Sequence, residues 1–135
     1  MKKVEVVAAI INNNGNILCC QREVNKLTYL SEKWEFPGGK LEEGETREEA
    51  LVREIDEELE MVISNIELAL TVVHKYEDFE LTMHTYKVST TQTKFKLHAH
   101  KKAIWTPLEK LNKLQNGIKQ YYLHIPFVYF GLQLP

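Results

Sequence analysis

The sequence predicts one domain of the α+β class, a mixed α/β arrangement in which antiparallel strands combine with capped helices. Segments rich in β-branched residues alternate with turn signals, and a helical repeat follows a capping box in the middle of the chain. The chain has 135 residues, within the range of about 100 to 200 that is typical of one domain. We therefore expect residues 1–135 to form a single domain.

Composition excludes several classes of protein. The chain is 44% hydrophobic and 27% charged, as in ordinary globular proteins, and its net charge of -2 argues against binding of polymeric nucleic acid. The apolar run at residues 6–11 is too short for a membrane helix or a signal peptide. Cys19 and Cys20 are adjacent and therefore poor disulfide partners. We expect a cytoplasmic monomer or homodimer without membrane contact.

The first third of the chain is predicted to contain three strands. Residues 4–11 and 17–20 are apolar and β-branched, and the Asn14-Gly15 pair between them favours a tight hairpin. Residues 21–33 are polar and lack periodicity, which predicts a loop long enough to bind a ligand. Residues 34–36 resemble a short strand that ends in a turn at Pro37-Gly38-Gly39.

A helix is predicted to begin after Thr46. Thr46 and Glu49 match a capping box, in which each side chain bonds to the backbone of the other residue. Leu51, Ile55 and Leu59 recur every four residues, so the helix should bury one stripe and extend to about Met61.

The second half continues with strands and a further helix. Residues 63–73 and 79–88 are strand candidates, and residues 94–100 alternate basic with apolar side chains, which predicts another strand. A second capping box, from Thr106 to Glu109, predicts a short helix, and the aromatic segment 121–132 is expected to end in a helix that begins near Pro126.

Glu54, Glu57 and Glu58 should share one face of the central helix. Carboxylates three or four residues apart repel each other by a few tenths of a kcal/mol per pair, and the negative end of the helix dipole disfavours them further. A cation should compensate this charge, and Mg²⁺ prefers such oxygen ligands. The alternative is an acidic helix face that water alone solvates.

Two features upstream bear on this patch. The glycines of residues 37–40 allow the backbone to lie close to a ligand and free a carbonyl to point at a metal. Glu45 and Arg53 are too far apart in the sequence for a helical ion pair, so Arg53 could hold the loop carboxylate against the helix.

Together these residues resemble a known motif. The spacing of Gly39, Glu45, Arg53, Glu54, Glu57 and Glu58 closely resembles the Nudix box, G-x5-E-x7-R-E-U-x-E-E-x-G-U with U aliphatic, over residues 39–61. Residues 4–11, 34–40 and 103–107 are also similar to MutT-type enzymes and to CTP pyrophosphohydrolases.

The resemblance implies an α/β/α sandwich around a mixed sheet, and hydrolysis of a nucleoside diphosphate linked to another group, with Mg²⁺ or Mn²⁺. It also implies roles for individual residues. Glu54, Glu57, Glu58 and the Gly38 carbonyl would bind the metal, Glu45 and Arg53 would orient them, and Glu57 is the candidate base.

Three positions depart from the family pattern. Glu60 replaces the last glycine of the box, at a cost of about 1 kcal/mol if the helix ends in a left-handed residue. Ala99 stands where many relatives carry a late glutamate. His98 and His100 beside it could contact phosphate or act as a base, and the alternative is that both are surface residues. His124 stands where relatives often use Asn or Asp to read the base.

The function implied is a Mg²⁺-dependent nucleoside triphosphate pyrophosphohydrolase that acts on CTP, dCTP or a modified pyrimidine nucleotide. The alternatives are an 8-oxo-dGTP diphosphatase and a Nudix module that binds a nucleotide without hydrolysis. The substrate contacts expected are Arg22, Phe36, Lys40 and His124. For Phe36 the alternative is a core position, and for Arg22 a solvated strand end.

Overall fold

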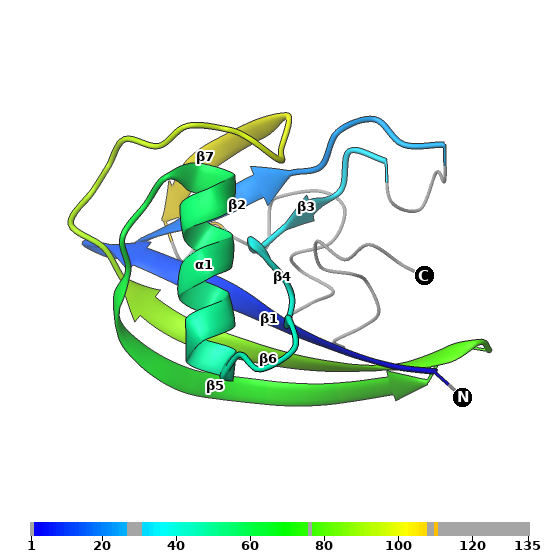
Figure 1. Cartoon of the computed structure of the whole chain (residues 1–135). Coiled ribbons are helices and arrows are strands. Elements are labelled where there is room, and N and C mark those ends of the chain that lie inside the picture. The colour runs from blue at the N-terminus through cyan, green and yellow to red at the C-terminus, as the bar shows by residue number, and fades with distance from the viewer. Residues whose placement is uncertain (1, 27–30, 76, 108–109, 111–135) are drawn as a thin grey trace.

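The computed structural model describes residues 2–26, 31–75, 77–107 and 110 (Figure 1). Its elements are β1 Lys2–Asn13, β2 Asn16–Gln21, β3 Trp34–Glu35, β4 Gly38–Lys40, α1 Arg47–Leu59, β5 Ser64–Lys75, β6 Phe79–Ser89 and β7 Lys102–Pro107. The predicted helix start at Thr106 is wrong, because Thr106 and Pro107 end strand β7, where they pair with β2. The remainder of the predicted second helix and the aromatic segment 121–132, including His124, lie outside the described residues.

The strands form one mixed sheet. Its order is β3-β2-β1-β6-β5, with β4 paired to β1 and β7 paired to β2. β1 and β6 are parallel from Lys2↔Phe79 to Asn12↔Ser89, whereas β5 is antiparallel to β6. Helix α1 lies across one face of this sheet (Figure 1). The predicted α+β class with a mixed sheet is therefore confirmed.

The predicted hairpin joins β1 to β2. Asn14 and Gly15 both have positive φ, of 50° and 87°, as a two-residue type I′ turn requires. The Asn12 side chain accepts a hydrogen bond of 2.9 Å from the Gly15 amide, and Asn13 pairs with Asn16. The Asn-Gly pair therefore sets the register of the two strands.

Gly38 and Gly39, which were predicted to form a turn after β3, belong to a strand instead. Gly38–Lys40 forms β4, which pairs with β1 through Val7↔Gly39 and Ala8↔Gly38. A Cβ atom at Gly38 would lie 2.0 Å from the Val7 carbonyl oxygen, so only glycine fits this close pairing. The prediction of a turn was wrong because these glycines serve a close approach between two backbones.

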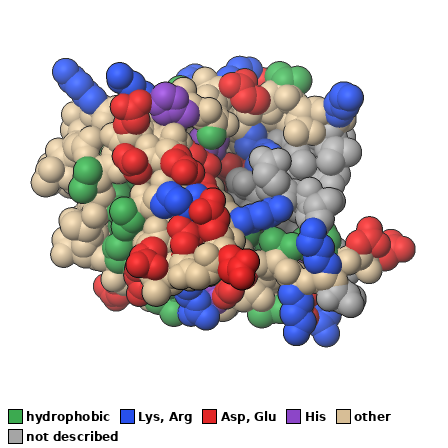
Figure 2. Space-filling model, viewed as in Figure 1, with side chains coloured by type: hydrophobic (Ala, Val, Ile, Leu, Met, Phe, Trp, Pro, Cys, Tyr) green, Lys and Arg blue, Asp and Glu red, His purple; other side chains and the backbone are tan. Residues whose placement is uncertain are grey.

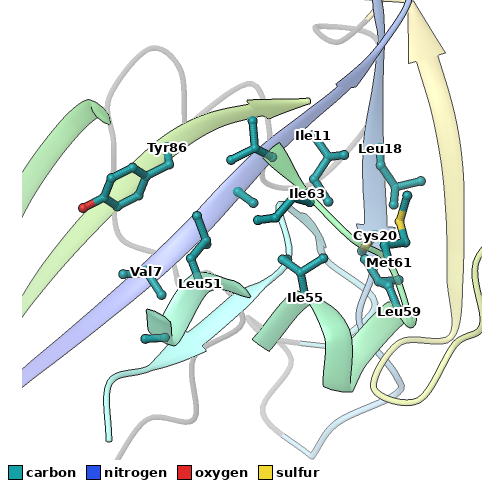
Figure 3. Close-up of a cluster of buried hydrophobic side chains, with 13 residues drawn as sticks. Val7, Ile11, Leu18, Cys20, Leu51, Ile55, Leu59, Met61, Ile63 and Tyr86 are labelled. Atoms are coloured by element: carbon teal, nitrogen blue, oxygen red, sulfur yellow. The ribbon is translucent and has the colours of Figure 1, made fainter. Parts of the chain in front are cut away.

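Helix α1 begins as predicted. The Glu49 amide donates to Thr46 Oγ1 at 3.1 Å, and the Thr46 amide donates to Glu49 Oε1 at 2.9 Å. The predicted stripe is buried against β1 and β6, in a cluster that includes Val7, Ile11 and Tyr86 (Figure 3). The helix ends at Leu59, two residues before the predicted end at Met61.

Residues 94–100, predicted to be a strand, have no strand partner in the described part of the chain. The Lys96 amide donates to the Leu59 carbonyl at 3.0 Å, and the His98 amide donates to the Glu58 carbonyl at 3.1 Å. Both carbonyls belong to the last turn of α1, where no helical donor is available. The segment therefore caps a helix end and does not add a strand to the sheet.

Within the described residues, no helix is long and apolar enough to cross a membrane.

Replacing Gly38 by alanine should destabilise the metal-free protein by at least about 2 kcal/mol, because the added methyl group overlaps the β1 backbone. Gly15→Asn is the control, since nothing lies within 4 Å of that position and asparagine tolerates positive φ. Urea unfolding of both variants measures the difference. Equal stability would contradict the tight β1–β4 pairing.

Candidate active site

Acidic side chains gather around a basic side chain over α1 (Figure 2). Glu54, Glu57 and Glu58 come from the second half of the helix, as the periodicity predicts. They differ in exposure: the Glu54 side chain is 15% exposed and the Glu57 side chain 58%. Glu57 therefore lies at the surface, whereas Glu54 is largely enclosed.

Arg53 links this patch to the preceding loop. Its guanidinium binds Glu45 through two hydrogen bonds, Nε to Oε2 at 2.6 Å and a terminal nitrogen to Oε1 at 2.9 Å. The remaining terminal nitrogen donates to Glu54 at 3.0 Å and to Glu57 at 3.1 Å. The ion pair between Glu45 and Arg53 is thus present, and the Arg53 hydrogen bonds lower the pKa of Glu45 to about 2.

Glycine at position 39 makes room for Glu54. A Cβ atom built on Gly39 would lie 2.5 Å from the Glu54 carboxyl carbon. Burial raises the pKa of Glu54, although its hydrogen bond with Arg53 acts in the opposite direction. The close approach of β4 to α1 therefore encloses a carboxylate that would otherwise be solvated.

Glu58 differs from the other carboxylates of the patch in having a buried oxygen without a partner among the described residues. Within the described residues, its Oε1 atom is buried and has no hydrogen-bond partner. Burial, followed by the charges of Glu54 and Glu35, raises the pKa of Glu58 to about 9, whereas a backbone hydrogen bond from Gly38 lowers it. Such an atom needs a donor or a cation, and oxygen ligands of this kind fit Mg²⁺ or Mn²⁺.

The carboxylates are not arranged as a complete metal site in this structure. Among residues 2–26, 31–75, 77–107 and 110, no three His, Cys, Asp or Glu side chains are placed to bind one metal ion. Arg53 holds both Glu54 and Glu57. Both contacts are made through Oε1 atoms, and a carboxylate offers two oxygens as ligands. The Gly38 carbonyl remains a predicted ligand.

A pocket of about 210 Å³ opens beside Glu58. Its polar wall includes Arg22, Glu35 and His100, which the sheet brings together because β2 lies between β3 and β7. Glu35 Oε1 is 3.3 Å from an Arg22 nitrogen, and Glu35 Oε2 is 2.9 Å from His100 Nε2. Sequence reasoning missed Glu35, since its partner His100 lies 65 positions away.

The predicted substrate contacts have different surroundings. Arg22 lines the pocket, and Lys40 is exposed on β4 with its carbonyl bonded to Arg53 at 3.1 Å. Phe36 is fully buried in the core among Val4, Val6 and other side chains. The prediction that Phe36 stacks on a base therefore needs correction, because an enclosed ring has no face open to a ligand.

Glu60, which replaces the box glycine, is left-handed with φ of 54°. Its side chain lies 2.5 Å from His98 Nε2 and 4.0 Å from Lys96 Nζ, and the His98 hydrogen bond lowers its pKa. These contacts offset part of the cost of the left-handed conformation and attach residues 94–98 to the end of α1. His98 is accordingly a half-exposed partner of Glu60.

Known proteins are similar to this chain in fold and in sequence. A family model described as the NUDIX domain matches residues 1–125. The 8-oxo-dGTP diphosphatase of Proteus vulgaris is 36% identical over 89 residues, covering 65% of this chain and 78% of that protein. The CTP pyrophosphohydrolase of Escherichia coli (strain K12) is 34% identical over 110 residues, covering 82% and 80%. The solution structure of the E. coli ORF135 protein matches with a TM-score of 0.70 and 34% identity, covering 83% and 79%.

The raised pKa of Glu58 predicts that stability depends on pH. Between its ordinary value of 4.5 and about 9, the folded metal-free protein binds more protons than the unfolded chain, so the free energy of unfolding falls as pH rises. Glu58→Gln should remove this slope and raise stability at pH 8 by at least about 1 kcal/mol, a few degrees in Tm. Thermal melts in EDTA from pH 5 to 9 test this. Parallel pH curves for both proteins would contradict it.

Two substitutions at Glu60 separate strain from contact. Glu60→Gly relieves the left-handed strain, whereas Glu60→Ala keeps it, and both lose the contact to His98. The free energy of unfolding of the alanine variant should therefore be about 1 kcal/mol lower than that of the glycine variant. Equal values in urea unfolding would mean that the helix does not end in a left-handed residue.

Proposed function

This chain belongs to the Nudix family of nucleotide hydrolases, and we propose that it is a Mg²⁺-dependent nucleoside triphosphate pyrophosphohydrolase. It would convert a nucleoside triphosphate and water to the nucleoside monophosphate and pyrophosphate. The observation that carries the proposal is the buried Oε1 of Glu58, which has no hydrogen-bond partner in the described part of the chain and lies on the same helix as Glu54 and Glu57. We also take residues 1–135 as one Nudix domain.

The metal site would consist of Glu54, Glu57, Glu58 and the Gly38 carbonyl, with Arg53 and Glu45 as positioning residues. Mg²⁺ is the expected ion and Mn²⁺ also suits these oxygen ligands. When bound, the ion neutralises phosphate oxygens and lowers the pKa of water. Arg53 can orient Glu54 and Glu57 because its guanidinium is anchored twice to Glu45.

Other residues of the chain would hold the triphosphate. Arg22 borders the pocket, and its hydrogen bond to Glu35 leaves further guanidinium donors for phosphate oxygens. Lys40 is exposed on β4, directly after Gly38 and Gly39. Its flexible side chain can bring a positive charge to the phosphates. His124 is proposed to contact the base. Among the box residues, Glu57 is the candidate acceptor of a proton from the attacking water.

The leading substrate is CTP, dCTP or a modified pyrimidine triphosphate. This choice is supported by the CTP pyrophosphohydrolase of E. coli, whose match extends over more of the chain than that of the diphosphatase from P. vulgaris. The second candidate is 8-oxo-dGTP. It is supported by the similarity of this chain to the 8-oxo-dGTP diphosphatase of P. vulgaris.

A panel of normal and oxidised triphosphates, assayed with Mg²⁺, tests the proposal. CTP or dCTP should release pyrophosphate and the monophosphate, and Glu57→Gln should lower kcat at least a hundredfold because a metal ligand is lost. Asp56→Asn, which removes an exposed charge from the same helix, should leave kcat within twofold.

Each other result has a distinct meaning. Preference for 8-oxo-dGTP would replace the pyrimidine assignment and keep the reaction. Binding without turnover of any triphosphate would identify a nucleotide-binding module and overturn the proposed activity.

A further inference from the structure

The two histidines beside Ala99 have different surroundings. His98 is half-exposed and bonds to Glu60 at the end of α1. His100 is buried and lines the pocket beside Glu58. Of the two, only His100 therefore lies where a substrate near Glu58 could meet it.

Glu35 fixes the orientation of the His100 ring. The side chains of both residues are 4% exposed, and His100 Nε2 lies 2.9 Å from Glu35 Oε2. An ionised carboxylate only accepts hydrogen bonds, so Nε2 carries the hydrogen of this contact. In neutral His100, Nδ1 then holds a lone pair.

Ionisable residues lie around His100. Arg22 and Glu35 form an ion pair beside the ring. Glu58 and Glu23 are the other acidic residues of the pocket lining.

Two residues of this pocket have polar atoms that lack partners within the described residues, His100 Nδ1 and Glu58 Oε1. Buried polar atoms of this kind are normally satisfied by water or a ligand. The pocket is polar, and about 210 Å³ is ample for water and a phosphate oxygen. His100 and Glu58, each with a buried polar atom of this kind, thus line the same pocket.

We propose that His100 is a catalytic residue whose Nδ1 takes the proton of the attacking water, and that Glu35 positions it. This inference rests on the proposed function. An O–H bond of water breaks and its proton goes to Nδ1, the water oxygen bonds to phosphorus, and the P–O bond to the leaving group breaks. Imidazolium then returns the proton to solvent.

This assignment replaces Glu57 as the proton acceptor. The Glu57 side chain is 58% exposed, its carboxylate bonds to Arg53, and it does not line the pocket. Glu57 keeps its proposed role as a metal ligand. A base oriented by a carboxylate is also the arrangement that general-base catalysis commonly uses.

The test compares His100→Gln with His98→Gln, at saturating Mg²⁺ and with the best triphosphate of the panel. Glutamine at position 100 can keep a bond to Glu35 through its amide nitrogen but has no basic nitrogen. It should lower kcat by about 10² to 10⁴-fold, with KM within threefold and Tm unchanged. His98→Gln should retain kcat within twofold.

Two further variants separate base chemistry from positioning. Added imidazole should restore part of the kcat of His100→Ala, which a purely structural histidine would not allow. Glu35→Gln should lower kcat, and the double variant with His100→Gln should be no slower than His100→Gln alone, because both act through one nitrogen.

The outcomes separate this inference from the proposed function. If wild type releases pyrophosphate and His100→Gln retains more than a tenth of its kcat, His100 is not the base, and the proposed function stands. If wild type hydrolyses no triphosphate, both proposals fail.

Discussion

One guanidinium holds the acidic face of this protein together. Arg53 contacts Glu45, Glu54 and Glu57, and Glu42 lies 3.6 Å away, so a single positive charge is shared among several carboxylates. Glu58 is not among these partners: burial and the charges of Glu54 and Glu35 raise its pKa, and a backbone hydrogen bond from Gly38 lowers it. The charge balance of the patch is therefore incomplete within the described chain. A divalent cation would complete it, and the proposed chemistry depends on that.

Local signals predicted much of the fold. The Asn14-Gly15 turn and the Thr46 capping box depend on contacts between residues at most three positions apart, which a sequence displays directly. The buried stripe of α1 follows from helical periodicity. The same periodicity placed Glu54, Glu57 and Glu58 on one face and suggested that Arg53 reaches back to the loop. The acidic half of the site was thus readable from the sequence.

Features that depend on distant partners were not predicted. The glycines of β4 resemble a turn, because a sequence does not tell a glycine that bends the chain from one that admits a second backbone. Residues 94–100 alternate as any extended segment does, whether the partner is a strand or a helix end. Phe36 and Glu35 are adjacent in the sequence, yet the Phe36 side chain packs in the core, whereas Glu35 bonds to His100, which lies 65 positions further along the chain. The pocket wall thus emerges only from the sheet topology.

Binding of Mn²⁺ to the nucleotide-free protein, followed by electron paramagnetic resonance, tests the central claim most directly. Free Mn²⁺ gives a strong signal that is lost on binding, so a titration yields the number and affinity of sites. Wild type should bind Mn²⁺, Asp56→Asn should bind it equally well, and Glu58→Gln should bind at least about tenfold more weakly. Equal affinity in wild type and Glu58→Gln would show that the buried carboxylate is not a metal ligand.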